Sequence, residues 1–109
     1  MNTTKIETTL SRADFRELLL QYKATLFVTP HAFNHLNYAQ RKLFKEKELK
    51  NIILKENPRG IGIQRNGRYA VFYKRKNGFI KIICEIKRQR FEIITFINIE
   101  RMPNLKRLK

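Results

Sequence analysis

The first part of the chain shows apolar residues at helical spacing behind a capping residue. The apolar stripe consists of Phe15, Leu18, Leu19 and Tyr22, at positions i, i+3, i+4 and i+7. Ser11 precedes this stripe, and Asp14 three residues later completes a weak form of the capping box. This pattern predicts a helix over residues 11–23. The short apolar stretch 24–28 fits either a strand or an extended link.

Two further helices are predicted between residues 29 and 55. Thr29 is a suitable N-cap and Pro30 suits the first helical position, so a helix is expected to begin there. The apolar face of that helix would consist of Ala32, Leu36, Ala39 and Leu43. A third helix is predicted over residues 45–55, with Leu49, Ile52 and Ile53 facing inward. The sequence NPRG at 57–60 ends it.

After Gly60 the apolar spacing changes from helical to alternating, which is typical of strands. Strands are predicted over residues 61–64, 68–75, 79–87 and 91–99. Asn-Gly pairs at 66–67 and 77–78 predict type I′ turns, because these turns need positive φ at both central residues. One face of the third strand would hold Ile80, Ile82, Cys84 and Ile86. One face of the fourth would hold Phe91, Ile93, Thr95, Ile97 and Ile99.

These elements predict an α+β fold in which N-terminal helices pack on a four-stranded antiparallel β-meander. One face of such a sheet must be covered, and the helices are the only cover that the pattern offers. The length fits a single domain over residues 1–109, and we expect residues 1–10 and 104–109 to be frayed.

Charge narrows the possible partners. The 24 Lys and Arg against 9 Asp and Glu give a net charge of +15 and a pI near 10.5. Residues 65–109 hold 13 basic and 3 acidic residues, so +10 of the charge lies in the C-terminal part. A basic surface of this kind indicates nucleic-acid binding, because phosphate neutralisation supplies most non-specific affinity. An anionic membrane, an acidic protein or plain solubility would also fit.

The remaining composition excludes several classes of protein. Cys84 is the single cysteine, so no intramolecular disulfide can form, and we interpret it as a small core residue. The chain contains no signal peptide pattern and no apolar run long enough to span a bilayer, which predicts a cytoplasmic protein. His31 and His35 have metal-pair spacing without a third ligand nearby, so we expect no metal and no cofactor.

Two segments could carry chemistry. His31 would lie in the first turn of a helix, where backbone amides attract phosphate and the helix dipole favours neutral imidazole. The strand that spans residues 68–75 interleaves basic and aromatic residues, which can neutralise phosphate and stack on bases. The candidate catalytic residues are His31, Arg68, Tyr73 and Lys74, and the candidate nucleic-acid contacts are Tyr69, Arg75, Lys81, Lys87, Arg88 and Arg90. A partly buried capping histidine and an ordinary solvated sheet face are the plainer interpretations.

Such a basic site could cleave RNA without a metal. The 2′-hydroxyl supplies the nucleophile, and the protein needs a base, an acid and cations for the developing negative charge. His, Tyr, Lys and Arg are sufficient for these roles. DNA lacks the 2′-hydroxyl and would not be cut.

The order of these segments resembles a family of small prokaryotic proteins. The segment VTPHAF at 28–33 contains a T-x-H-A helix start, and NGRYAV at 66–71 and ITF at 94–96 follow in the strands. Over residues 27–105 this order resembles the RelE/ParE/BrnT-like toxin superfamily. The resemblance implies a RelE-like fold and a ribonuclease toxin that is often ribosome-associated and is neutralised by a separate antitoxin, which an acidic partner would fit. It matches His31, Arg68 and Tyr69 to family positions, and Thr95 to a polar residue of the final strand. The leading helix, residues 11–23, departs from the family pattern.

The sequence therefore favours an RNA-binding, metal-independent endoribonuclease. The first alternative is a non-catalytic nucleic-acid-binding protein, such as a regulator or a mobile-element protein. The second is an inhibitor of a host protein that acts through the apolar and basic C-terminus.

Overall fold

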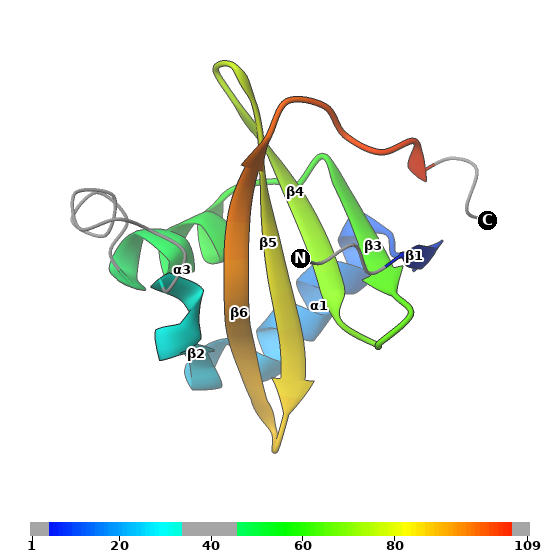
Figure 1. Cartoon of the computed structure of the whole chain (residues 1–109). Helices are drawn as coiled ribbons and strands as arrows, with labels where there is room; N and C mark the ends of the chain where they lie inside the picture. Colours follow the sequence, from blue (N-terminus) through cyan, green and yellow to red (C-terminus); the bar gives the residue numbers. More distant parts are fainter. Residues whose placement is uncertain (1–4, 34–45, 106–109) are drawn as a thin grey trace.

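The computed structural model describes residues 5–33 and 46–105. Its elements are β1 (Ile6–Thr9), α1 (Arg12–Tyr22), η1 (Lys23–Thr25), β2 (Leu26–Val28), η2 (Pro30–Phe33), α3 (Glu46–Lys55), β3 (Gly60–Gln64), β4 (Tyr69–Arg75), β5 (Gly78–Lys87) and β6 (Arg90–Ile99). The long strands β4, β5 and β6 form the centre of a curled sheet; in the view of Figure 1, α1 lies behind it and α3 lies at the left, beside β6.

The strands form one mixed sheet in the order β1-β3-β4-β5-β6-β2. The predicted meander exists as its antiparallel centre, β3 to β6. The predicted fold class, N-terminal helices packed on a four-stranded RelE-like meander, is nevertheless wrong. β1 pairs antiparallel with β3 at one edge, β2 pairs parallel with β6 at the other, and the described residues contain only two α-helices.

Neither edge strand was predicted outright: β1 has no strand pattern, and β2 lies in the stretch 24–28, which the sequence left open as a strand or an extended link. β1 has the sequence IETT and exposes all its residues except the half-buried Ile6, so it shows no apolar alternation. β2 is only three residues long. Both are fixed by pairing with distant strands. We expected residues 1–10 to be frayed, and residues 6–9 of that segment form β1.

The helix α1 follows its predicted signals. Ser11 is the N-cap, and its hydroxyl accepts a hydrogen bond of 3.0 Å from the backbone N–H of Asp14. Phe15 is buried and meets Phe91 of β6 edge to face, with ring centroids 6.2 Å apart. These contacts dock the helix on the sheet.

The second predicted helix lies mostly outside the described residues, as do Leu36, Ala39 and Leu43. The described part, η2, is a 3₁₀ turn that contains His31 and the buried Ala32. The third predicted helix is confirmed as α3.

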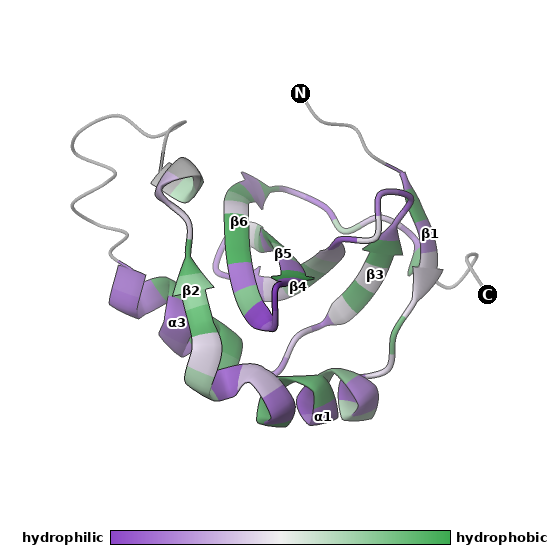
Figure 2. Ribbon diagram, turned by 90° about the horizontal axis from the view of Figure 1, so that it is seen from below, coloured by the Kyte–Doolittle hydropathy of each residue, from purple (hydrophilic) through white to green (hydrophobic). Residues whose placement is uncertain are grey.

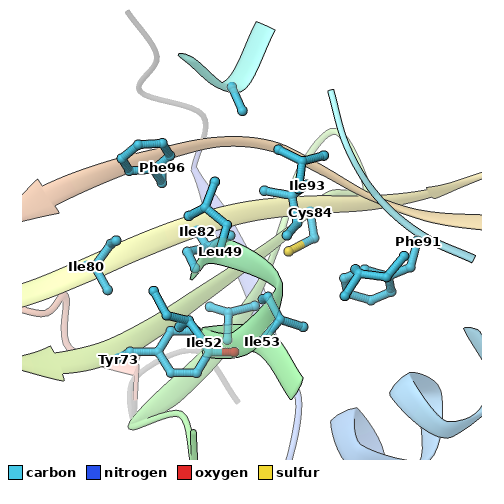
Figure 3. Packing of buried hydrophobic residues seen from close by; sticks show 14 of the residues in the cluster. Leu49, Ile52, Ile53, Tyr73, Ile80, Ile82, Cys84, Phe91, Ile93 and Phe96 are labelled. Atoms are coloured by element: carbon cyan, nitrogen blue, oxygen red, sulfur yellow. The ribbon is translucent and has the colours of Figure 1, made fainter. Parts of the chain in front are cut away.

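The main hydrophobic core lies between the sheet and the helices, on what we call the helix face of the sheet. Figure 3 shows Leu49, Ile52 and Ile53 of α3 directed at the sheet residues of this core. Alternate residues of β4 and β5 meet them, including Tyr73, Ile80, Ile82 and Cys84. The prediction that Cys84 is a core residue is confirmed: it is 0 % exposed, and burial raises the pKa of its thiol.

A smaller apolar cluster covers part of the opposite side, which we call the second face. It contains Ala70, Phe72 and Ile83, with Ile6, Ile94, Ile99, Met102 and Leu105 packed around them. Gly60 makes room for the segment after β6, because a Cβ there would lie 2.6 Å from Leu105 Cδ1 and 2.8 Å from Met102 Cε. The rest of the second face combines polar side chains with a few apolar ones, among them Phe79 and Ile97.

The turns differ from the prediction. Gly67 and Gly78 have positive φ (86° and 142°), whereas the asparagine before each of them does not. The two-residue turn with positive φ at both central residues lies instead at Arg88 and Gln89 (54° and 64°), between β5 and β6. Left-handed non-glycine residues are uncommon and cost about 1 kcal/mol or more each. This hairpin is therefore held closed by the long β5–β6 ladder.

Candidate nucleic-acid interface

The second face of the sheet brings several predicted site residues together. Lys81 of β5 lies opposite Phe72 of β4 and Ile97 of β6. One step along β5, Ile83 lies opposite Thr95 of β6. Residues that pair across strands share a face, so Lys81 and Thr95 are near neighbours.

Thr95 reaches this face because of a β-bulge. Cys84 pairs with Ile93 and Ile83 pairs with Thr95, so Ile94 is an extra residue on β6. The predicted face of β6, with Phe91, Ile93, Thr95, Ile97 and Ile99 together, is therefore wrong. Phe91 and Ile93 point into the main core, whereas the residues after the bulge change sides.

Thr29 holds the bulge in place. Its backbone N–H donates to the carbonyl of Ile93 at 3.0 Å, and its hydroxyl donates to the carbonyl of Ile94 at 3.3 Å. The carbonyl of Thr29 accepts from the N–H of Ala32, which starts η2. The Thr29–Pro30 dipeptide, predicted as a helix start, thus anchors η2 to β6 beside Thr95.

These residues line a small pocket of about 90 Å³. Its walls are Gln64, Asn66, Arg68, Lys81, Ile83, Thr95 and Ile97. Three of them, namely Arg68, Lys81 and Thr95, were predicted from the sequence. Gln64 and Asn66 were not predicted; Gln64 is the last residue of β3, and Asn66 lies in the β3–β4 turn.

Lys81 is the most unusual group in this pocket. Its side chain is partly buried, and burial lowers the pKa of its ammonium below the usual 10.5. Among the described residues its ammonium has no ion-pair or hydrogen-bond partner. A partly desolvated amine of this kind is available to an anion.

Two ion pairs orient the arginines of the second face. Arg68 Nε donates to Glu85 Oε1 at 2.7 Å, and Arg90 Nη2 donates to Glu92 Oε2 at 2.8 Å. Glu85 and Glu92 are cross-strand partners, so the two pairs form one row across the sheet. The Arg90 guanidinium also lies 4.6 Å from the ring centroid of Phe27 on β2. The carboxylates, which the sequence did not single out, hold both arginines in place.

The basic surface continues to the end of the β5–β6 hairpin. Lys87, Arg88 and Arg90 are all exposed there. The tip ends in the turn at Arg88 and Gln89, where both residues have positive φ. All three basic residues were predicted as nucleic-acid contacts.

The strip 68–75 does not act as one surface, because its residues alternate between the two faces. Tyr73 was predicted to be catalytic, but its side chain is 0 % exposed in the main core, which corrects that prediction (Figure 3). Tyr69 packs against the same core. Arg75 is bound at 2.8 Å to Glu56 after α3, on the helix side.

Two predicted catalytic residues remain outside the pocket. Lys74 lies at the other end of β4, where its Nζ donates to the carbonyl of Arg75 at 2.8 Å and stands 5.0 Å from the ring centroid of Phe79. The backbone of His31 belongs to η2, which packs beside β6, while its side chain lies outside what the structure describes.

The described residues contain no group of three or more His, Cys, Asp or Glu that could hold a metal ion. None of the described helices is long and apolar enough to cross a membrane. No family model, curated protein or solved structure matches the chain. The site must therefore be interpreted from its own geometry.

Proposed function

We propose that this chain binds RNA through the second face of its sheet, with one backbone phosphate in the pocket of Arg68, Lys81 and Thr95. The observation that carries the proposal is the partly buried Lys81 amine, which lines this pocket without a partner among the described residues. An anion would offset the cost of desolvating this amine.

The size and chemistry of the pocket favour a phosphate. At about 90 Å³ it is smaller than the roughly 300–1,000 Å³ of pockets that enclose small-molecule ligands. An ammonium, a guanidinium, a hydroxyl and two carboxamides are the groups that proteins direct at phosphates and sugars. The hydroxyl of Thr95 and the carboxamide of Asn66 could also meet a 2′-hydroxyl, which distinguishes RNA from DNA.

The hairpin tip extends the contact beyond one phosphate. Lys87, Arg88 and Arg90 would neutralise neighbouring phosphates along the same strand of RNA. The Phe27 ring, held under Arg90, adds an aromatic surface at the edge of this row.

Fluorescence anisotropy with a labelled single-stranded RNA, the matching DNA and the RNA duplex tests this proposal. Lys81→Gln is expected to weaken RNA binding about tenfold and to reduce the slope of log K against log salt by about 0.7, the value for one phosphate contact on a single strand. Lys47→Gln on the exposed side of α3 is the matched control. Equal effects of the two substitutions would show that net charge alone, and not this pocket, drives binding.

Cleavage of the bound RNA without a metal is a second candidate function, which the position of the partly buried Lys81 amine in one pocket with Arg68 and Thr95 favours. A neutral Lys81 amine could accept the proton of the 2′-hydroxyl while the 2′-oxygen forms its bond to phosphorus. The bond from phosphorus to the 5′-oxygen then breaks, and that oxygen takes a proton from water. Arg68 would stabilise the charge on the phosphorane. The products are a 2′,3′-cyclic phosphate and a 5′-hydroxyl.

Incubation with total RNA and with ribosomes on mRNA, in EDTA, separates the two functions. If the chain cleaves, Lys81→Arg should retain binding and lose cleavage, because arginine supplies a positive charge for the phosphate but cannot act as a base. His31→Ala tests the base predicted from the sequence in the same assay. Binding without new RNA ends would leave the non-catalytic function.

A further inference from the structure

A groove of about 590 Å³ lies between α1 and α3, on the side of the molecule away from the second face. Figure 2 shows α1 below the curled sheet and α3 to its left, partly behind β2, with apolar segments on both helices. The floor of the groove is formed by Phe15 and Leu19 of α1 and Ile53 of α3. The groove is apolar at its base and open to solvent.

Two exposed leucines flank this groove. Only three large apolar side chains of the described residues are exposed: Leu20 (62 %), Leu54 (44 %) and Ile97 (41 %). Leu20 and Leu54 both line the groove, one from each helix. Exposed apolar residues that gather around one depression mark an interaction site, whereas a single one needs no explanation.

The rim of the groove is basic. Arg12, Arg16, Lys23 and Lys55 line it, and none of the four has a carboxylate partner among the described residues. Its one acidic residue, Glu56, is already neutralised by Arg75 at 2.8 and 3.2 Å.

Two hydrogen bonds fix one end of the groove. Arg12 Nε donates to the carbonyl of Pro58 at 2.7 Å, and Arg16 Nη2 donates to Asn57 Oδ1 at 2.9 Å. Both bonds tie α1 to the segment after α3. The groove is therefore formed before any partner arrives.

We infer that this groove docks an amphipathic, acidic helix of a partner protein. The apolar floor and the two leucines would receive residues at i, i+3, i+4 and i+7, which is how helices bind in grooves. Acidic residues beside that stripe would face the cationic rim, so the charges are complementary. A nucleic acid fits poorly, because Phe15, the aromatic side chain in the groove, is 2 % exposed and cannot stack on a base.

This inference is independent of the proposed RNA binding. The groove lies across the sheet from Lys81 and Thr95, so both sites can be occupied at once. A partner here would tether the chain without covering the second face.

The test uses a labelled 18-residue helical peptide with leucines at i, i+3, i+4 and i+7 and Asp and Glu on both flanks. We expect saturable binding in fluorescence anisotropy, and no comparable binding of a scrambled peptide of equal composition. The double variant with Leu20→Ser and Leu54→Ser should bind the peptide at least about tenfold more weakly. Ile97→Ser on the second face is the matched control and should bind normally.

A charge exchange tests whether the basic rim of the groove contacts the acidic residues of the peptide. The double variant Lys23→Glu with Lys55→Glu should bind the acidic peptide more weakly. A peptide in which Lys replaces the Asp and Glu residues should bind this variant again. Equal binding of the designed and scrambled peptides would overturn the inference. So would a preference for phosphatidylglycerol vesicles that depends on Leu20 and Leu54, or a dimer in light scattering that the double serine variant abolishes.

Discussion

Replacing Tyr73 by Phe is expected to stabilise the fold by about 1 kcal/mol and to leave RNA binding unchanged. The Tyr73 ring is 0 % exposed, and Figure 3 shows it beside Ile52 of α3. Its hydroxyl is the one buried side-chain polar atom without a hydrogen-bond partner in the described part of the chain. Burying such a group costs about 1–3 kcal/mol, and phenylalanine keeps the ring while removing the hydroxyl.

Urea denaturation followed by circular dichroism measures this change. With a slope of about 1–3 kcal/mol per molar urea, a gain of 1 kcal/mol moves the midpoint up by about 0.3–1 M. Tyr69→Phe on the same strand is the control, because Tyr69 is only half-buried and its hydroxyl is not among the buried unpaired atoms. Loss of stability in Tyr73→Phe would show that the hydroxyl has a partner. Loss of RNA binding at unchanged stability would restore Tyr73 to the site.

The same substitution should change the response to alkali. Burial raises the pKa of Tyr73 above its usual 10.0, so the folded state holds the phenolic proton more tightly than the unfolded state does. The resulting stability is complete below about pH 10 and is lost as the pH rises further, by about 1.4 kcal/mol per pH unit. Cys84 adds a similar loss above its usual pKa of 9.0. Tyr73→Phe should remove only the loss of stability that begins near pH 10. An unchanged slope of stability against pH in that range would contradict the assignment of this loss to Tyr73.

Three further substitutions test the elements that position the interface. Gln89→Gly should stabilise the chain by about 1 kcal/mol in urea denaturation, because glycine adopts the positive φ of the β5–β6 turn without strain. A loss of stability would contradict the left-handed conformation of Gln89. Thr29→Val should lower the free energy of unfolding by about 1 kcal/mol and weaken RNA binding, because the Ile94 carbonyl in the bulge loses its hydroxyl donor. Thr29→Ser keeps this hydroxyl and should retain both the stability and the RNA binding. Gly62→Ala should destabilise the pairing of β1, since the added Cβ would lie 2.6 Å from Ile6 Cγ2, and Ile6→Ala in the same chain should restore stability if this contact is the cause.

Local sequence signals predicted most of the regular elements. The cap at Ser11, the α3 stripe and the alternation after Gly60 are each set by neighbours within a few residues, and each is confirmed. β1 was missed and β2 was left open between a strand and an extended link, because the hydrogen bonds of both come from β3 and β6, which lie far along the chain. Periodicity contains no information about such pairing.

Only part of the candidate site could be predicted, for the same reason. Charge and residue type pointed to Arg68, Lys81 and the hairpin arginines, but they could not say which strand residues face solvent. Alternation alone places Lys81 away from the apolar face of β5, whereas only the packing of α3 against β4 shows that Tyr73 is a core residue.

By itself the sequence determined a basic chain with an antiparallel strand centre, because charge and local alternation are properties of neighbouring residues. The tertiary structure decided the rest. One extra residue at Ile94, held by hydrogen bonds from Thr29, turns Thr95 toward Lys81 and so creates the pocket. A strand has a side-chain period of two, so a single inserted residue exchanges the faces of everything after it. That exchange depends on a partner 65 residues away, which no local pattern records.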